Sequence, residues 1–205
     1  HHCCRTKPRR DHWKSSARLG RLMVKEFDAD YSLRAAIVIQ NSPSTEFIGE
    51  QWSTLEASCG HALYLAERLL SAGGDIIFPG LEDLPRGERS KRPAVLDSRL
   101  AEVREMLAML KGGTGKSVSE LLRELGQDRD GVGHIYLFLA TAEPEILTAI
   151  SLFNPGSVTA FLYNGLEFSA RSNGRPLATS HEFMESLQRA GARTFVLGPG
   201  RSISR

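Results

Sequence analysis

Apolar runs of strand length alternate along the chain with segments of helical periodicity. The first run, RAAIVIQ at 34–40, is continuously apolar between its first Arg and its final Gln, which is typical of a strand buried on both faces. Runs at 75–80, 134–142, 157–164 and 193–198 predict further strands. This alternation predicts an α/β fold in which helices flank a mainly parallel central sheet.

The segments between these runs carry helix signals. STLE at 53–56 is a capping box, and Gly73 closes the helix that follows it. SVSE at 117–120 opens another helix, Pro144 suits a first helical position, and TSHE at 179–182 indicates a further cap. The predicted apolar faces consist of Leu55, Cys59, Ala62, Ala66 and Leu69; of Leu100, Val103, Leu107 and Leu110; and of Leu121, Leu122 and Leu125.

Two stretches have weaker signals. Residues 82–93 are charged and interrupted by Pro and Gly, which predicts an exposed loop. Residues 165–178, GLEFSARSNGRPLA, leave room for weak strands.

The helix marked by Leu100 is expected to end at Lys111 and Gly112.

Composition adds a basic arm to this picture. The chain has 205 residues, 41% of them hydrophobic, and a net charge of +2, which suits one globular domain. Residues 1–25 hold eight Arg or Lys against the single acid Asp11. We therefore divide the chain into a basic arm at 1–32 and a domain at 33–205. Such an arm is either a solvated flank or a docking element. Trp13 is the one aromatic among the basic residues of 1–25, which gives little support for nucleic acid as a partner.

Cysteine usage and apolar runs bear on location. Cys3, Cys4 and Cys59 are too few and too unevenly spaced for a disulfide framework, which favours a reducing, cytoplasmic setting. The sequence begins HHCC rather than with Met, so we expect a fragment or processed form with a frayed terminus rather than a metal site there. It contains no signal peptide and no apolar run of bilayer-spanning length.

The segment GGTGKS at 112–117 poses the sharpest chemical question, because its end resembles a phosphate-binding P-loop. That loop needs a Gly five residues before its Gly-Lys, and it follows directly from a strand. Leu110 occupies the required position here, inside a predicted helix. The strand at 134–142 also offers no acidic residue to hold Mg²⁺. A glycine-rich connection between helices, with Ser117 as N-cap, explains the segment without nucleotide hydrolysis.

A family resemblance gives the same segment another interpretation. Residues 12–31, HWKSSARLGRLMVKEFDADY, followed by AAIVIQNSPST at 35–45, resemble bacterial domain-of-unknown-function family 58. Its members typically carry a Trp-Lys-x-x-Ala-Arg segment before a von Willebrand factor A-like domain. The matching residues of that segment are Trp13, Lys14, Ala17 and Arg18. The resemblance implies a three-layer von Willebrand factor A-like fold, and a membrane-anchoring part outside this chain.

The resemblance also implies a degenerate metal-ion-dependent adhesion site. Von Willebrand A domains often hold Mg²⁺ through an Asp-x-Ser-x-Ser loop, a Thr in a Gly-Gly-Thr-like loop and an Asp after a later strand. The corresponding positions here form what we call the strand-end cluster: Gln40, Ser42, Ser44, Thr114 and Thr141. Both carboxylates are replaced, and Mg²⁺ prefers at least one, so we expect no metal and no other cofactor. Glu143 is either a substitute carboxylate or a charge at a helix N-terminus.

Other catalytic patterns are weak. NSPST at 41–45 lacks the glycines of a nucleophile elbow, and His61, His134 and His181 lie in predicted helices, strands or caps. The sequence therefore favours a non-catalytic protein-interaction module. The resemblance implies a MoxR-type AAA+ ATPase as a partner in chaperone-like assembly. The alternative is an enzyme that binds phosphate or a divalent metal in the crevice at the strand ends.

Overall fold

A computed structural model describes residues 34–81, 93–110, 116–127, 131–169 and 174–199. Within these ranges the chain forms a five-stranded sheet in the order β2-β1-β3-β4-β5, and every neighbouring pair is parallel. The strands are β1 (Arg34–Ile39), β2 (Asp75–Ile77), β3 (His134–Leu139), β4 (Val158–Tyr163) and β5 (Arg193–Leu197). The predicted α/β class with a parallel sheet is confirmed.

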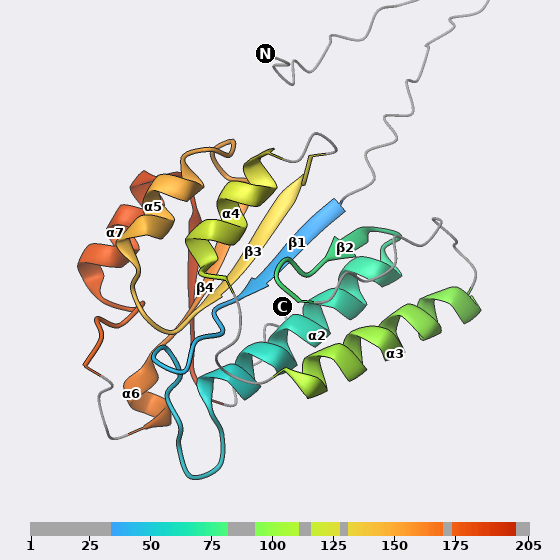
Figure 1. The fold of residues 1–205 in the computed structure, drawn as a ribbon, viewed down its shortest axis with the longest axis horizontal. Coiled ribbons are helices and arrows are strands. Elements are labelled where there is room, and N and C mark those ends of the chain that lie inside the picture. Colours follow the sequence, from blue (N-terminus) through green and yellow to red (C-terminus); the bar gives the residue numbers. More distant parts are fainter. Residues whose placement is uncertain (1–33, 82–92, 111–115, 128–130, 170–173, 200–205) are drawn as a thin grey trace, which may run out of the picture. The chain divides into compact units, whose positions relative to one another are not determined.

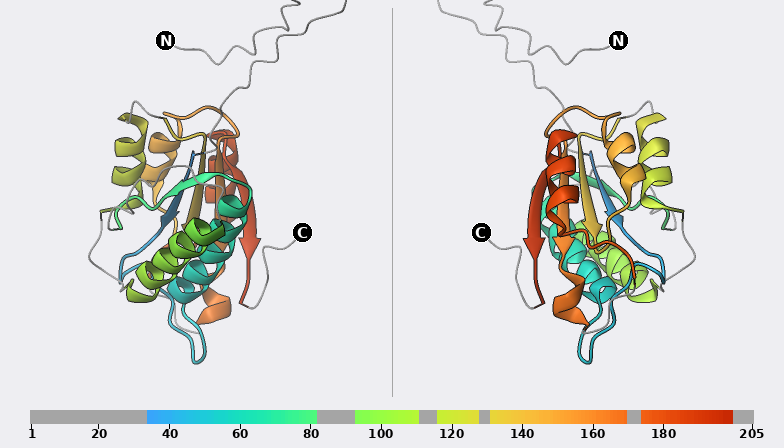
Figure 2. Two further views of the ribbon diagram at one scale, coloured as in Figure 1. Left: turned by 90° about the vertical axis from the view of Figure 1, so that its right-hand side faces the viewer. Right: turned by 90° about the vertical axis from the view of Figure 1, so that its left-hand side faces the viewer.

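Helices cover both faces of the sheet and give three layers (Figures 1 and 2). Helices α2 (Thr54–Ser71) and α3 (Pro93–Met109) pack on one face. Helices α4 (Val118–Gln127), α5 (Pro144–Ile150) and α7 (His181–Arg189) pack on the other. The short α6 (Gly165–Phe168) follows β4. Side chains of a strand alternate between its two faces, so Ala36 and Val38 join the core under α4, while Ala35 and Ile37 join the core under α2.

Local capping explains where two of the helices begin. The Ser53 hydroxyl accepts a hydrogen bond from the Glu56 N–H at 3.1 Å, and the Glu56 carboxylate accepts one from the Ser53 N–H at 2.8 Å. The expected capping box of α2 is therefore present. At the other end Gly73 has φ +78°, and its N–H donates to Leu70. Ser117 and Glu120 form the equivalent box before α4.

Several local predictions differ from the structure. The described part of 165–178 has no strand, only an isolated bridge between Thr141 and Leu177, and it begins with α6. Asn164 makes this helix possible, because its side-chain oxygen caps the Leu166 N–H at 3.3 Å. Helix α7 begins within TSHE, as predicted, with Ser180 at its N-cap position, although the Ser180 side chain makes no capping hydrogen bond.

Strand β3 ends at Leu139 instead of continuing to 142. The reason is that the next two N–H groups, of Ala140 and Thr141, donate to the Gln40 side chain. Strand β2 likewise stops at Ile77 rather than 80, since Gly80 turns the chain with φ +78°. Helix α3 ends at Met109, two residues before the expected Lys111, which itself lies outside the described ranges.

Candidate functional site

Gln40, the first residue after β1, is the centre of the strand-end cluster. Its side-chain oxygen accepts hydrogen bonds from the N–H groups of Ala140 (2.8 Å) and Thr141 (3.0 Å). Its amide nitrogen donates to the Thr141 carbonyl (3.2 Å), the Thr141 hydroxyl (3.0 Å) and the Glu143 carboxylate (2.6 Å). Only 8% of Gln40 is exposed. The side chain therefore ties the end of β1 to the end of β3.

These partners fix the direction of the Gln40 amide. Reversing it would place the amide nitrogen against two N–H donors and its oxygen against the Glu143 carboxylate. A donor group therefore faces Glu143. A divalent cation beside that carboxylate would meet the positive end of an N–H dipole, so the donor set at Gln40 fits a metal ion poorly.

The two serines of the first loop lie beside Gln40 in sequence but bond to each other. The Ser42 and Ser44 hydroxyl oxygens are 3.0 Å apart, with Ser44 exposed and Ser42 half-buried. Thr45, which the sequence analysis did not single out, fixes this loop: its hydroxyl donates to the Ser42 carbonyl at 2.7 Å. Thr45 is buried, and a Ser or Thr that bonds to the backbone three residues earlier is a signal readable in NSPST.

Thr141 is fully buried, and its hydroxyl accepts from Gln40, so it supports the cluster from inside. Thr114 lies outside the described residues, as do Trp13, Lys14, Ala17 and Arg18 of the family segment. The structure thus brings Gln40, Ser42, Ser44 and Thr141 to one end of the sheet, as the positions after parallel strands predict.

A cleft of about 340 Å³ opens beside this cluster. It joins the first loop to the start of α4 and to the segment before α5. Its charged lining residues are Lys116, Glu143, Glu145 and Arg175. The lining therefore combines two carboxylates with two cationic side chains, next to the hydroxyls of the serine loop. This mixture can accept and donate many hydrogen bonds without a strong net charge.

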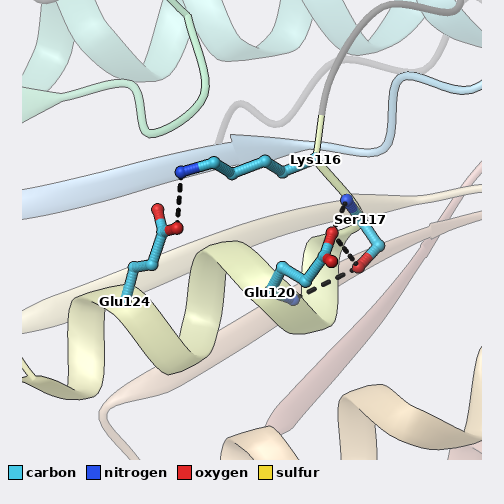
Figure 3. A network of polar contacts seen from close by, with 4 residues as sticks. All are labelled: Lys116, Ser117, Glu120 and Glu124. Atoms are coloured by element: carbon cyan, nitrogen blue, oxygen red, sulfur yellow. Dashed lines mark hydrogen bonds and ion pairs between the residues drawn. The ribbon is translucent and has the colours of Figure 1, made fainter.

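The Lys116 side chain forms an ion pair with helix α4 instead of standing ready to bind a phosphate. Its ammonium lies 2.5 Å from the Glu124 carboxylate, and Ser117 and Glu120 pair beside it (Figure 3). The segment preceding Lys116 follows helix α3, and the segment after it enters α4. A P-loop instead connects a strand to a helix. The arrangement of elements does not match a P-loop.

A second polar group lies under α2. The His61 ring nitrogen Nδ1 is 2.8 Å from the hydroxyl of Tyr163, which is fully buried. Burial raises the pKa of Tyr163 well above its usual range, and burial, with Glu46 and Glu56 adding to it, raises the pKa of Cys59 to about 11. A thiol with that pKa is almost wholly protonated at neutral pH, so Cys59 is a weak nucleophile.

The other two histidines have separate surroundings. His134 pairs with the Thr159 hydroxyl at 2.9 Å, and burial lowers its pKa. His181 is 89% exposed at its side chain and lies 3.0 Å from Glu185. Within the described ranges no three His, Cys, Asp or Glu side chains are grouped closely enough to hold a metal ion.

None of the described helices combines the length and apolar character needed to cross a membrane. No protein-family model matches the chain, and no curated protein matches it either.

Proposed function

We propose that this chain is a von Willebrand factor A-like domain that binds a protein partner through the loops at the carboxyl ends of its strands, without catalysis. The observation that supports this most directly is Gln40. At the position where the family resemblance implies a carboxylate, a neutral amide makes five hydrogen bonds to the protein itself. The group is part of the scaffold, and the proposed adhesion site is degenerate.

Exposed apolar side chains at the same end of the sheet support recognition of a protein. Ile48 and Trp52, in the loop after β1, are 70% and 59% exposed, and Leu166 in α6 is 52% exposed. We call these three residues the apolar rim. Trp is enriched among the residues that dominate binding energy at protein interfaces. A polar cleft bordered by exposed apolar groups is a surface that a partner can cover.

The rim stands on a fixed support. Phe47 is buried and lies so close to Gly165 that a Cβ there would come within 2.4 Å of its ring. A Cβ on Gly49 would come within 2.1 Å of the Phe168 carbonyl oxygen. The loop after β1 and helix α6 are therefore packed together, and both follow strands at the carboxyl edge (Figure 1). A preformed surface loses less entropy when it binds.

The partner we propose is a MoxR-type AAA+ ATPase, which follows from the family resemblance, in a chaperone-like assembly. The proposed setting is the cytoplasm, where a free thiol such as Cys59 stays reduced, with membrane association through a part outside this chain. The alternative is an enzyme that binds phosphate in the cleft. Lys116, Arg175 and the start of α4 favour it, whereas the ion pair of Lys116 with Glu124 opposes it.

The test is co-purification with a MoxR-type ATPase, with and without EDTA. We expect capture in both conditions, loss of capture with Trp52→Ala, and normal capture with Leu152→Ala. Leu152 is a matched control, because it is also 59% exposed but follows α5, away from the strand-end loops. Capture that requires a divalent ion, or that is equally sensitive to both variants, would contradict the proposal.

The enzyme alternative has its own test. A thermal-shift scan with ATP, phosphate and divalent ions should leave the midpoint unchanged. A ligand present at about a hundred times its dissociation constant would add roughly 2.7 kcal/mol of apparent stability, which such a scan detects readily. Stabilisation by phosphate that Lys116→Ala abolishes would favour the enzyme.

A further inference from the structure

The two edges of the sheet differ in a way that the proposed function does not explain. Edge strand β2 has three residues, and its first, Asp75, pairs with Arg99 at 2.9 Å and Arg34 at 3.9 Å. Short length and charge both discourage pairing with another strand. Edge strand β5 has five residues, of which Phe195 and Val196 are 53% and 43% exposed. Among the described residues, the β5 edge has neither protection beyond the single charge of Arg193 at its start.

Phe195 also ends an aromatic row that crosses the sheet. Phe138 of β3, Phe161 of β4 and Phe195 of β5 are register partners on the face that carries α2. Their ring centroids are 5.0 Å and 5.8 Å apart, within the range of favourable aromatic contacts. The first two rings are buried, but the third is half exposed. The row stops at the edge without a neighbour among the described residues.

We propose that β5 is a homodimer interface, where a second copy of this chain adds its own β5 antiparallel to the first. In such a dimer a twofold axis runs perpendicular to the sheet, so the face that carries α2 lies on the same side in both copies. Because side chains alternate along a strand, odd-numbered residues must then pair with odd-numbered residues, and even-numbered with even-numbered. The register centred on Phe195 meets this condition. It places the two Phe195 rings opposite each other, Thr194 opposite Val196 and Arg193 opposite Leu197.

The occupant is a second copy because β5 is complementary to itself in this register. The only charge in the strand, Arg193, falls opposite an apolar residue and meets no like charge. Thr194 and Val196 are β-branched and pair well across strands. The aromatic row then continues from one copy into the other. Five paired residues bury less area than most obligate dimers, so association should depend on concentration.

Sedimentation velocity across a concentration series tests the dimer. The wild-type sedimentation coefficient should rise with concentration, whereas Phe195→Lys should remain monomeric, because two ammonium groups would then oppose each other at the axis. Leu152→Lys makes a similar change at an exposed apolar site elsewhere and should dimerise normally. Circular dichroism confirms that each variant is folded. If the wild-type protein is monomeric at every concentration, the proposal is overturned, and any strand that pairs with β5 must come from a source other than a second copy of this chain.

Disulfide trapping tests the register. In a background with Cys3, Cys4 and Cys59 changed to Ser, Phe195→Cys should form a disulfide-linked dimer on mild oxidation. Directly opposed residues have Cα atoms about 4.5–5.5 Å apart, within disulfide range. Thr194→Cys is the control. In this register Thr194 lies opposite Val196 of the second copy, so the two introduced cysteines would be two positions out of register. Equal cross-linking by both variants, or none by Phe195→Cys, overturns the proposed pairing.

Discussion

Removing the Gln40 amide should be among the most destabilising single changes at the strand ends. In Gln40→Ala the N–H groups of Ala140 and Thr141 lose their acceptor, and both residues are buried, at 6% and 0% exposure. An unsatisfied buried donor costs about 1–3 kcal/mol. Two of them, with the small cavity left by the side chain, give an expected loss of about 4 kcal/mol, near the upper limit for point substitutions.

Urea unfolding followed by circular dichroism measures this loss as a change in the free energy of unfolding. Ser44→Ala is the control, because Ser44 belongs to the same cluster but is exposed, and it should cost less than about 0.5 kcal/mol. If Gln40→Ala costs under about 1 kcal/mol, the network contributes little and the proposed structural role of Gln40 is wrong.

A conservative variant separates the role of charge from that of shape. Gln40→Glu keeps an acceptor for the N–H groups of Ala140 and Thr141. It also places a carboxylate oxygen where the amide nitrogen now lies, 2.6 Å from the Glu143 carboxylate. We expect destabilisation at neutral pH that the double variant Gln40→Glu with Glu143→Gln relieves. Additive effects of the two changes would show that these side chains do not interact.

Four further outcomes are expected. Titration calorimetry with Mg²⁺ or Mn²⁺ should show no specific binding in the micromolar range; stoichiometric binding would mean that Glu143 has taken over as a ligand. Lys116→Ala should leave stability nearly unchanged and remove no ATPase activity, as its ion pair is exposed. Gly165→Ala should cost about 1–3 kcal/mol in urea unfolding because the methyl group would overlap the Phe47 ring, whereas Gly60→Ala, with open space around it, should not destabilise. Burial raises the pKa of Cys59 from 9.0 to about 11. The stability that the protonated Cys59 thiol contributes is therefore complete below pH 9.0 and is lost as the pH rises toward 11. Alkylation of Cys59, measured with Cys3 and Cys4 changed to Ser, should be slow below pH 9.0.

The sequence predicts the positions of the strands and main helices because burial periodicity is a local property. The apolar run at 34–40 is typical of a strand covered on both faces, and the STLE box correctly places the start of α2 after Ser53. The gathering of Gln40 with Thr141 followed from the rule that parallel strands end at one edge. These predictions needed no knowledge of side-chain geometry.

The sequence did not predict what the cluster residues bond to. Glu143 lies at the N-cap of α5, where its interpretation as a helix charge places it, but its side chain makes no capping hydrogen bond and instead accepts one from the Gln40 amide, 103 residues away in sequence. That bond depends on rotamers and on where β3 stops, which propensity does not determine. Helix α6 was missed for a local reason: NGLE at 164–167 is a capping sequence, but the helix is only four residues long, too short to show a period.

The strand order has a consequence for synthesis of the chain. Strand β1 lies between β2 and β3, but β3 follows it by about a hundred positions, as the 101-residue separation of Gln40 and Thr141 shows. A ribosome adding 5–20 residues per second needs on the order of ten seconds to make that interval. Throughout it, one of the most apolar strands of the protein has only the three residues of β2 as a sheet partner. The nascent chain is therefore most prone to aggregate before β3 emerges, and a truncation that ends after α3 should be recovered as an insoluble or chaperone-bound product.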